Sequence, residues 1–294
     1  MNEGENKREI EKQYKNALKD NPNDVATRLD YGNFLSEMGR LKEAEKQYKL
    51  ILQKDPNNVM AHTDYGLLLY RIGRMKEAEE QYKLALRADP KNIATHSNYG
   101  ILLETIGWTK EAEEQFKLSL EIDPKSYAAH SNYGLFLVEQ GRLDEAEKQL
   151  EIALEINPNE SIPHFNYGLT LYKMGRKEEA EEQYKLALKI DPKYAAVHCN
   201  YGAVLEETGR IEEAEEQYKL ALKIDPKHVP TRLNYAFLLE NVGRMNEAEI
   251  QYRLALKSDP NDKEVHYNYG LLLEKVGRLG DAQKHFKRAL EEKR

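Results

Sequence analysis

Histidine, the side chain that most often binds metal ions in proteins, recurs at one register of this sequence. The six residues are spaced by 34 or a multiple of 34: His62, His96, His130, His164, His198 and His266. A zinc site needs about four ligands within ~2 Å of one ion. Side chains one period apart would be separated by packed helices, each about 10 Å across, so they are too distant to share an ion. We therefore interpret this register as hydrogen-bonded histidine at the edge of a core, and expect no metal or other cofactor.

Other chemistry has no recognisable motif in the chain. The glycine-rich phosphate-binding motifs, the H-E-x-x-H metalloprotease motif and the G-x-S-x-G nucleophile motif are all missing from the sequence. Carboxylates are abundant, but they fall on regular, solvated helix faces. No constellation pairs a nucleophile with a base, so we predict that the chain is not an enzyme.

Composition narrows the class of partner. The 294 residues are 32% charged and carry a net charge of -7, which disfavours nucleic acid because phosphate binding needs clustered Lys and Arg. No stretch approaches the roughly 18 apolar residues of a membrane span, and the polar start does not resemble a signal peptide. The single cysteine is consistent with a reducing compartment. We predict a cytoplasmic protein that binds neither nucleic acid nor membrane.

The elements that carry these residues repeat every 34 residues. The dipeptide Tyr-Gly, or once Tyr-Ala, occurs eight times from Tyr31 to Tyr269. A second glycine lies seven residues after each dipeptide, and a proline precedes each unit. In the second unit, residues 58–71 predict one helix and residues 75–88 another. The intervening glycine ends the first helix at a positive φ, and Pro90 ends the second. Each period is therefore expected to fold as a helix pair.

Small and aromatic residues at fixed offsets identify the type of repeat. Counted from Val25, the eighth position is Gly32, the twentieth Ala44, the twenty-fourth Tyr48 and the thirty-second Pro56. This pattern resembles the tetratricopeptide repeat family, and eight units cover residues 21–294. The resemblance implies an all-α fold, a right-handed superhelical α-solenoid of antiparallel helix pairs stacked around one continuous core. We expect residues 21–294 to form one solenoid domain, preceded by an unpaired second helix in residues 1–20.

The resemblance also implies which face binds a partner, because the first helices of this family line a concave groove. A turn of 100° per residue places the fourth, seventh, eighth and eleventh positions on the packing side. The second, fifth, ninth and twelfth positions lie opposite, with the sixth at the edge. Cys199 occupies a fifth position and is expected to be an ordinary groove or surface thiol. Some relatives grip a C-terminal carboxylate with two lysines, and their absence here argues against that ligand.

The candidate groove residues fall into two groups. Side-chain amides at the sixth position could pair with both polar groups of a peptide bond in an extended ligand, like the asparagine ladders of some relatives. Apolar residues at the ninth and fifth positions could supply anchors. The sixth-position group is Asp30, Asp64, Asn98, Asn132, Asn166, Asn200, Asn234 and Asn268. The apolar group is Leu67, Ile101, Leu135, Phe165, Leu169, Phe237, Tyr267 and Leu271.

These residues predict a scaffold that binds an extended peptide or helix of a partner protein. Because Glu104, Glu206, Glu240 and Glu274 add negative charge at the twelfth position, we expect a ligand with apolar and some basic residues. Two alternatives remain open. The chain could be a structural protein that forms homo-oligomers through its uncapped terminal helices, or a regulatory subunit of a larger complex. Trp108, at a register otherwise held by arginine, is either a turn-packing residue or a local contact point.

Overall fold

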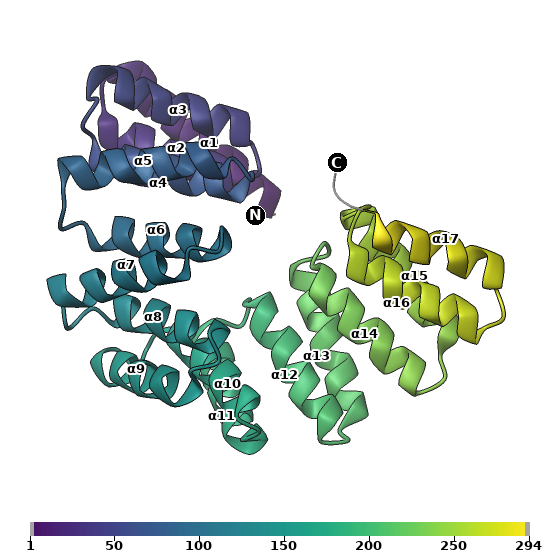
Figure 1. Cartoon of the computed structure of the whole chain (residues 1–294). Helices are drawn as coiled ribbons and strands as arrows, with labels where there is room; N and C mark the ends of the chain where they lie inside the picture. Colours follow the sequence, from purple (N-terminus) through teal and green to yellow (C-terminus); the bar gives the residue numbers. More distant parts are fainter. Residues whose placement is uncertain (1–2, 292–294) are drawn as a thin grey trace. The chain divides into compact units, whose positions relative to one another are not determined.

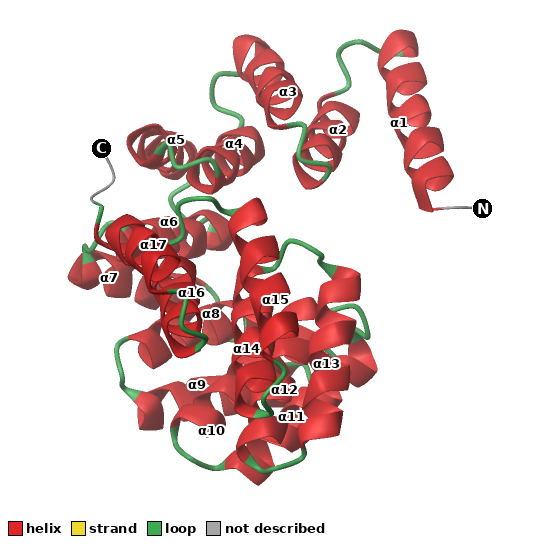
Figure 2. Cartoon of the chain, turned by 90° about the vertical axis from the view of Figure 1, so that its right-hand side faces the viewer, coloured by secondary structure: helices red, strands yellow, loops and turns green. Residues whose placement is uncertain are grey.

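The computed structural model describes residues 3–291, which form helices and loops without a strand in that range (Figures 1 and 2). Residues 1–2 and 292–294, which the repeat pattern assigns to the half-repeat and the eighth repeat, lie outside the described residues. The chain divides into two compact units, here the N-terminal unit, which ends at Gln140, and the C-terminal unit, which begins at Gly141. Each unit is described by itself. The expectation of a single solenoid domain stays a prediction.

Helices of two kinds alternate along the described chain. The first helices of the repeats are α2 (Val25–Glu37), α4 (Val59–Arg71), α6 (Ile93–Thr105), α8 (Tyr127–Glu139), α10 (Ser161–Lys173), α12 (Ala195–Glu207), α14 (Val229–Asn241) and α16 (Lys263–Lys275). The second helices are α1 (Glu3–Asp20), α3 (Leu41–Lys54), α5 (Met75–Ala88), α7 (Thr109–Ile122), α9 (Leu143–Ile156), α11 (Lys177–Ile190), α13 (Ile211–Ile224), α15 (Met245–Ser258) and α17 (Leu279–Leu290). This architecture confirms the predicted all-α solenoid of helix pairs.

Local signals set where the helices begin and end. The side chain of Asn58 accepts a hydrogen bond from the backbone N–H of Ala61, which satisfies one of the free donors at the start of α4. At the other end, Gly73 has a φ of 80°, a left-handed conformation that only glycine adopts without strain. The chain therefore reverses within three residues, and α5 packs back against α4.

Each pair packs closely because its first helix carries a glycine where its second helix carries an aromatic ring. A Cβ atom added to Gly66 would lie 2.6 Å from Cε1 of Tyr82, so the ring lies directly on the backbone of α4. Gly202 and Tyr218 repeat this arrangement in the C-terminal unit, with a distance of 2.7 Å. The aromatic ring is fully buried in both pairs. Burying such a ring is one of the larger apolar contributions that a single side chain makes to stability.

Neighbouring repeats are joined on the second-helix side by a charged cluster. The carboxylate of Glu215 on α13 accepts hydrogen bonds from Arg244 and from the Tyr235 hydroxyl of the next repeat, both at 2.7 Å. Lys219 of the same helix lies 2.7 Å away. Glu11 on α1 is held in the same way by Arg40, Lys15 and Tyr31. Helix α1 therefore docks on α2 as a second helix docks on the repeat that follows it.

The arginine of this cluster is replaced once, at Trp108. Glu79 lies where the cluster's glutamate is expected, and it contacts Lys83 at 2.6 Å and the Tyr99 hydroxyl at 3.3 Å. Trp108 itself occupies the N-cap position of α7, without a capping hydrogen bond from its side chain, and is 49% exposed. About half of the residue's surface is therefore in solvent, and the indole is not part of the N-terminal unit's buried core.

Candidate functional site: the first-helix face

Within each unit, the sixth and ninth positions lie on the same side of each first helix, and we call the surface that they form the first-helix face. Large apolar residues on it are well exposed: Phe237 by 59%, Leu271 by 41% and Leu67 by 37%. Ile101, Leu135 and Leu169, the other predicted anchors at the ninth position, are half-buried. The ninth position thus presents a row of accessible apolar side chains within each unit, which is the kind of surface that commonly contacts partners.

The sixth-position side chains differ in what they contact. Asp30 is exposed, whereas Asn166 is almost fully buried. Asn200 donates from Nδ2 to the backbone carbonyl of Ala196, at 2.9 Å, on its own helix. The remaining members are half-buried: Asp64, Asn98, Asn132, Asn234 and Asn268. The exposure of the sixth-position side chains therefore differs from repeat to repeat, and the amide ladder stays a prediction.

The fifth position is more buried than a single-helix wheel predicts. First helices contact one another within each unit, as α4 does with α6 and α12 with α14, and the fifth position lies in these contacts. The Thr63 hydroxyl lies 2.6 Å from the Thr95 hydroxyl across such a contact. Cys199, expected in the groove or on the surface, is only 3% exposed, and that expectation was wrong.

The two predicted anchors at the fifth position differ in exposure. Phe165 is half-buried, with its ring centroid 5.2 Å from that of Tyr194 and 6.2 Å from that of Tyr184. Tyr267 is 53% exposed and packs against Phe286, with 5.9 Å between ring centroids. Tyr267 is thus available to a partner, whereas Phe165 mainly packs within the C-terminal unit.

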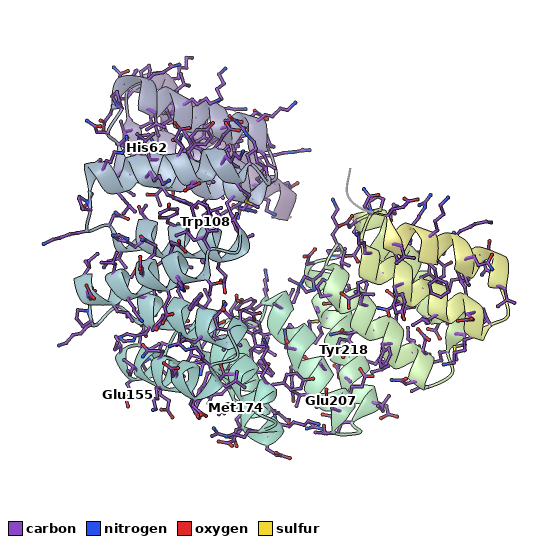
Figure 3. The ribbon with its side chains drawn as sticks, in the orientation of Figure 1. His62, Trp108, Glu155, Met174, Glu207 and Tyr218 are labelled. Carbon is purple, nitrogen blue, oxygen red and sulfur yellow. The ribbon has the colours of Figure 1, made fainter. Side chains whose placement is uncertain are left out.

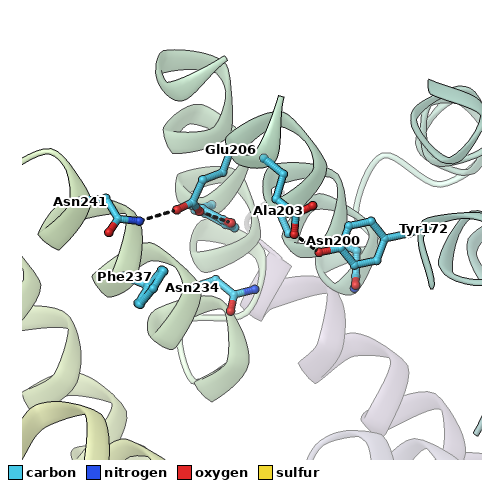
Figure 4. A pocket seen from close by; sticks show the side chains of 9 residues that line it. Tyr172, Asn200, Ala203, Glu206, Asn234, Phe237 and Asn241 are labelled. Atoms are coloured by element: carbon cyan, nitrogen blue, oxygen red, sulfur yellow. Dashed lines mark hydrogen bonds between the residues drawn. The ribbon is translucent and has the colours of Figure 1, made fainter. Parts of the chain in front are cut away.

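A pocket of about 500 Å³ opens on the first-helix face of the C-terminal unit (Figure 4). It is hollowed at Ala203, because the ninth position holds a leucine, an isoleucine or a phenylalanine in six of the other repeats and an asparagine in the seventh. We call it the Glu206 pocket. Its lining residues come from α10, α12, α13 and α14: Tyr172, Asn200, Ala203, Glu206, Glu207, Tyr218, Asn234, Phe237 and Asn241.

The two carboxylates of this pocket have different electrostatic environments. Glu207 is paired with Lys177 at 2.8 Å and accepts a hydrogen bond from the Tyr172 hydroxyl, and these contacts lower its pKa. Glu206 accepts from the Tyr218 hydroxyl at 3.0 Å and from Asn241 Nδ2 at 3.2 Å. Burial raises the pKa of Glu206, and no Lys or Arg of the described chain forms an ion pair with it. The pocket therefore contains one half-buried carboxylate without a cationic partner.

Sequence reasoning did not single out Tyr172, Tyr218 or Asn241. The hydroxyl of Tyr218 reaches Glu206 from the second helix beneath it, and Figure 3 labels Tyr218 and Glu207 on these neighbouring helices of the C-terminal unit. Asn241 reaches Glu206 from the next repeat, at a spacing of 35 residues. The same spacing joins Tyr70 to Thr105 and Tyr172 to Glu207. Polar residues spaced by 35, one more than the repeat period, are therefore the sequence signal that could have identified these contacts between repeats.

The recurrent histidines bind neighbouring protein groups. Both ring nitrogens of His62 are engaged, Nδ1 with Gln81 Oε1 at 2.8 Å and Nε2 with the Pro56 carbonyl at 2.9 Å. Arg28 makes the same two contacts, with Gln47 at 2.8 Å and Pro22 at 2.6 Å. Histidine or arginine thus ties the start of a first helix to the loop before it and to the second helix after it. Within residues 3–291, no group of three or more His, Cys, Asp or Glu side chains is arranged to hold a metal ion.

None of the described helices combines the length and apolar character that crossing a bilayer requires. The charged clusters on the second helices, such as the one around Glu215, account for part of this polarity. The expected cytoplasmic location remains a prediction.

Comparison with protein families gives one consistent result. Four family profiles, each described as tetratricopeptide repeat, match the chain. Their ranges are 126–193, 205–272, 35–93 with 165–229, and 94–126 with 263–294. Together they cover residues 35–294. No curated protein matches the chain in sequence.

Solved structures share the fold at low sequence identity. A human IFIT1 dimer with m7Gppp-AAAA matches with a TM-score of 0.68 and 18% identity, over 95% of this chain and 76% of that one. The Cut9–Hcn1 hetero-tetramer of APC/C gives 0.69 and 13%, over 97% and 53%. A tetratricopeptide repeat protein from Parabacteroides merdae gives 0.63 and 17%, over 91% and 99%. Identities in this range establish a common fold only.

Proposed function

Since the chain belongs to the tetratricopeptide repeat family, whose members generally mediate protein interactions, we propose that it binds an extended segment of a partner protein on its first-helix face. The observation that carries this proposal is the exposed apolar row at the ninth position, above all Phe237 and Leu271. Apolar anchors that remain exposed cost solvation free energy, and a partner segment would remove them from water.

Backbone polar groups of such a segment need hydrogen-bond partners as well. Asn234 and Asn268 are half-buried at the sixth position, one turn before Phe237 and Leu271 on the same helices. Side chains three residues apart lie on one helix face. An extended segment lying along these helices would therefore meet an amide and an apolar anchor from each repeat.

The negative charge of the chain favours a peptide over a nucleic acid as the ligand. The IFIT1 structure contains m7Gppp-AAAA, so a solenoid of this fold is able to hold a capped oligonucleotide in that protein. The present chain has 51 acidic and 44 basic residues, and the pocket on its first-helix face is lined by carboxylates and amides. Phosphates would be repelled there. We therefore propose that the ligand is a protein segment with some basic residues, and that the chain does not bind nucleic acid.

The proposal is tested with peptides selected from a random display library on the full chain. Binding of a selected peptide is measured by fluorescence polarisation for the parent chain, for Leu271→Ser and for Leu186→Ser. The two leucines are equally exposed, at 41% each, but Leu186 lies on the second helix α11. We expect Leu271→Ser to weaken binding at least about tenfold and Leu186→Ser to leave it unchanged. The reverse pattern would place the ligand on the second helices.

Self-association through the terminal helices is a second candidate function. The last helix, α17, has an exposed apolar side, with Leu279 58% and Leu290 82% exposed. Light scattering over a concentration series tests this candidate, and Leu279→Glu is the variant that should abolish any association. A particle of constant monomer mass at every concentration would eliminate it.

A further inference from the structure

We infer that the Glu206 pocket binds one arginine side chain of the extended partner segment, and so sets a sequence preference on the first-helix face. The inference rests on the proposed function and specifies its ligand. The juxtaposition that carries it is an unpaired carboxylate, Glu206, beside two amide oxygens and an exposed aromatic ring in a hollow of about 500 Å³.

The amides of the pocket expose acceptors. Asn200 donates from Nδ2 to a backbone carbonyl and Asn241 donates to a carboxylate, and both of these partners are acceptors only. These contacts fix the orientation of the two side chains, so that each Oδ1 remains free to accept. Asn234 likewise directs its Nδ2 to Cys199 Sγ, at 3.5 Å. A pocket lined by acceptors favours a ligand group that is rich in donors, and a guanidinium has five N–H groups and no acceptor.

The aromatic wall favours the same group. Phe237 is 59% exposed and lies between Asn234 and Asn241 on α14, one turn from each. In the view of Figure 4, Phe237 lies with Asn241 and Asn234 on one side of the pocket, and Tyr172 lies with Asn200 on the other side. A planar guanidinium stacks on such a ring while its edge meets a carboxylate, whereas an ammonium makes less use of the ring face.

The chain itself provides an internal comparison. The equivalent hollow of the N-terminal unit, about 210 Å³, is lined by Asn33, Ser36, Glu37, Tyr48, Asp64, Leu67, Leu68 and Arg71. There, Arg71 occupies the register of Asn241, and its Nη1 donates to Ser36 Oγ at 3.3 Å. A guanidinium of the chain thus already fits a hollow of this type. In the Glu206 pocket a carboxylate replaces Ser36, and the neutral Asn241 replaces the arginine.

The following repeat provides the second comparison. Glu240 occupies the register of Glu206 and accepts from the Tyr252 hydroxyl at 2.7 Å. Its neighbour at the register of Asn241 is Lys275, whose Nζ lies 4.0 Å from Glu240. Glu240 therefore has a cation from the chain, and Glu206 does not. We conclude that the cation for Glu206 comes from the ligand.

The test uses display selection of random peptides on the full-length chain and on four variants. Glu206→Gln removes the charge, Asn241→Lys supplies a cation from within, and Ala203→Leu fills the hollow. Glu240→Gln is the matched control, because it removes a half-buried carboxylate at the same register outside the pocket. We expect arginine to be enriched at one peptide position for the parent and for Glu240→Gln, and this enrichment to be lost for the other three.

A binding measurement then isolates the pair. In the best selected peptide, the arginine is replaced by citrulline, which keeps the shape and removes the charge. On the parent chain this should weaken binding at least about tenfold, the effect of one desolvated, charge-assisted contact. On Glu206→Gln the same replacement should change binding less than about twofold. Equal losses on both chains would overturn the inference, and so would substitution of lysine for arginine without loss.

The two proposals fail in different ways. Peptides that depend on Leu271 but show no preference for arginine would overturn the arginine inference and leave the proposed function standing. If no peptide depends on Leu271, the proposed function fails, and the inference fails with it. Asn241→Lys guards against trivial loss by misfolding, because it copies the native Lys275–Glu240 pair and should melt no lower than the parent.

Discussion

The hydroxyl of Tyr218 donates to Glu206 across 3.0 Å and joins the second helix α13 to the first-helix face of the same repeat. Tyr184 occupies the same register one repeat earlier, is fully buried, and has a hydroxyl without a hydrogen-bond partner among the described residues. The twelfth position explains the difference, because it is Glu206 beside Tyr218 and Tyr172 beside Tyr184. The first-helix side chain therefore decides whether this buried hydroxyl is satisfied.

Because only one of the two tyrosine hydroxyls has a partner, replacing each tyrosine with phenylalanine should have different effects on stability. Tyr218→Phe should lower the free energy of unfolding by about 1 kcal/mol, because it removes a hydrogen bond to a carboxylate. Tyr184→Phe should be neutral or slightly stabilising, because it removes a polar atom that is buried without a partner. Urea unfolding followed by circular dichroism compares the two variants. Equal destabilisation of both would contradict this account, because it would show that the hydrogen bond to Glu206 makes no difference to stability.

Acid should destabilise the chain through the charged clusters between repeats. Hydrogen bonds from Arg244, and further ones from Lys219 and Tyr235, lower the pKa of Glu215 from 4.5 to about 2, against the opposing effect of burial. A carboxylate whose pKa is lower in the folded state stabilises the fold above its unfolded pKa, and this stability is lost as the pH falls through the folded value. We therefore expect the urea midpoint to fall between about pH 4.5 and pH 2.

Glu215→Gln checks the assignment of that acid dependence. The variant should be less stable than the parent at pH 7, and its midpoint should change less between pH 5 and pH 2.5. Glu216→Gln is the control, since Glu216 is an exposed neighbour on the same helix. If both variants follow the parent's pH profile, the cluster around Glu215 does not carry the effect.

Replacing Trp108 with arginine should restore the missing arginine of the charged cluster around Glu79. Arg74 contacts Glu45 at 3.0 Å and Glu77 at 2.5 Å, and the equivalent carboxylates for residue 108 are Glu79 and Glu111. Exposed ion pairs contribute little to stability because water and salt screen them, so only a small rise in Tm is expected. Differential scanning calorimetry measures it. A clear fall in Tm would instead show that the indole packs on its turn and stabilises it.

The recurrent histidines should be replaceable by arginine but not by an apolar residue. His96 contacts Gln115 at 2.7 Å and the Pro90 carbonyl at 3.0 Å, and Arg232 makes the equivalent contacts in its own repeat. His96→Arg should keep the parent stability to within about 1 kcal/mol. His96→Leu should cost about 1–3 kcal/mol, because it removes the hydrogen bonds to Gln115 and to the Pro90 carbonyl. Thermal unfolding of both variants tests this role.

The sequence predicted those features of the fold that repeat with the period. Glycine and proline at fixed offsets end the helices, and the pairing of Gly66 with Tyr82 follows from the need for a small residue opposite a ring. The helix pairs and the buried register of the histidines could therefore be anticipated. Each depends on residues within one repeat or on the spacing of 34.

Features that depend on contacts between first helices were harder to anticipate. A helical wheel treats each helix alone, so it placed Cys199 on an open side, whereas the neighbouring first helix buries it. The Glu206 pocket depends on a long reach from Tyr218 and on the small size of Ala203. Neither property belongs to a periodic pattern, and both become evident only when side chains of different repeats are seen together.

Paramagnetic relaxation from a spin-labelled peptide tests the central claim most directly, because it reports which helices the ligand touches. A display-selected peptide carrying a nitroxide is added to the isotope-labelled chain, and the loss of amide signal is mapped. Binding on the first-helix face predicts the strongest losses around Asn200, Phe237 and Leu271, with signals near Leu186 and Ile224 on the second helices retained. Strong losses confined to the second helices around Leu186 and Ile224 would contradict it.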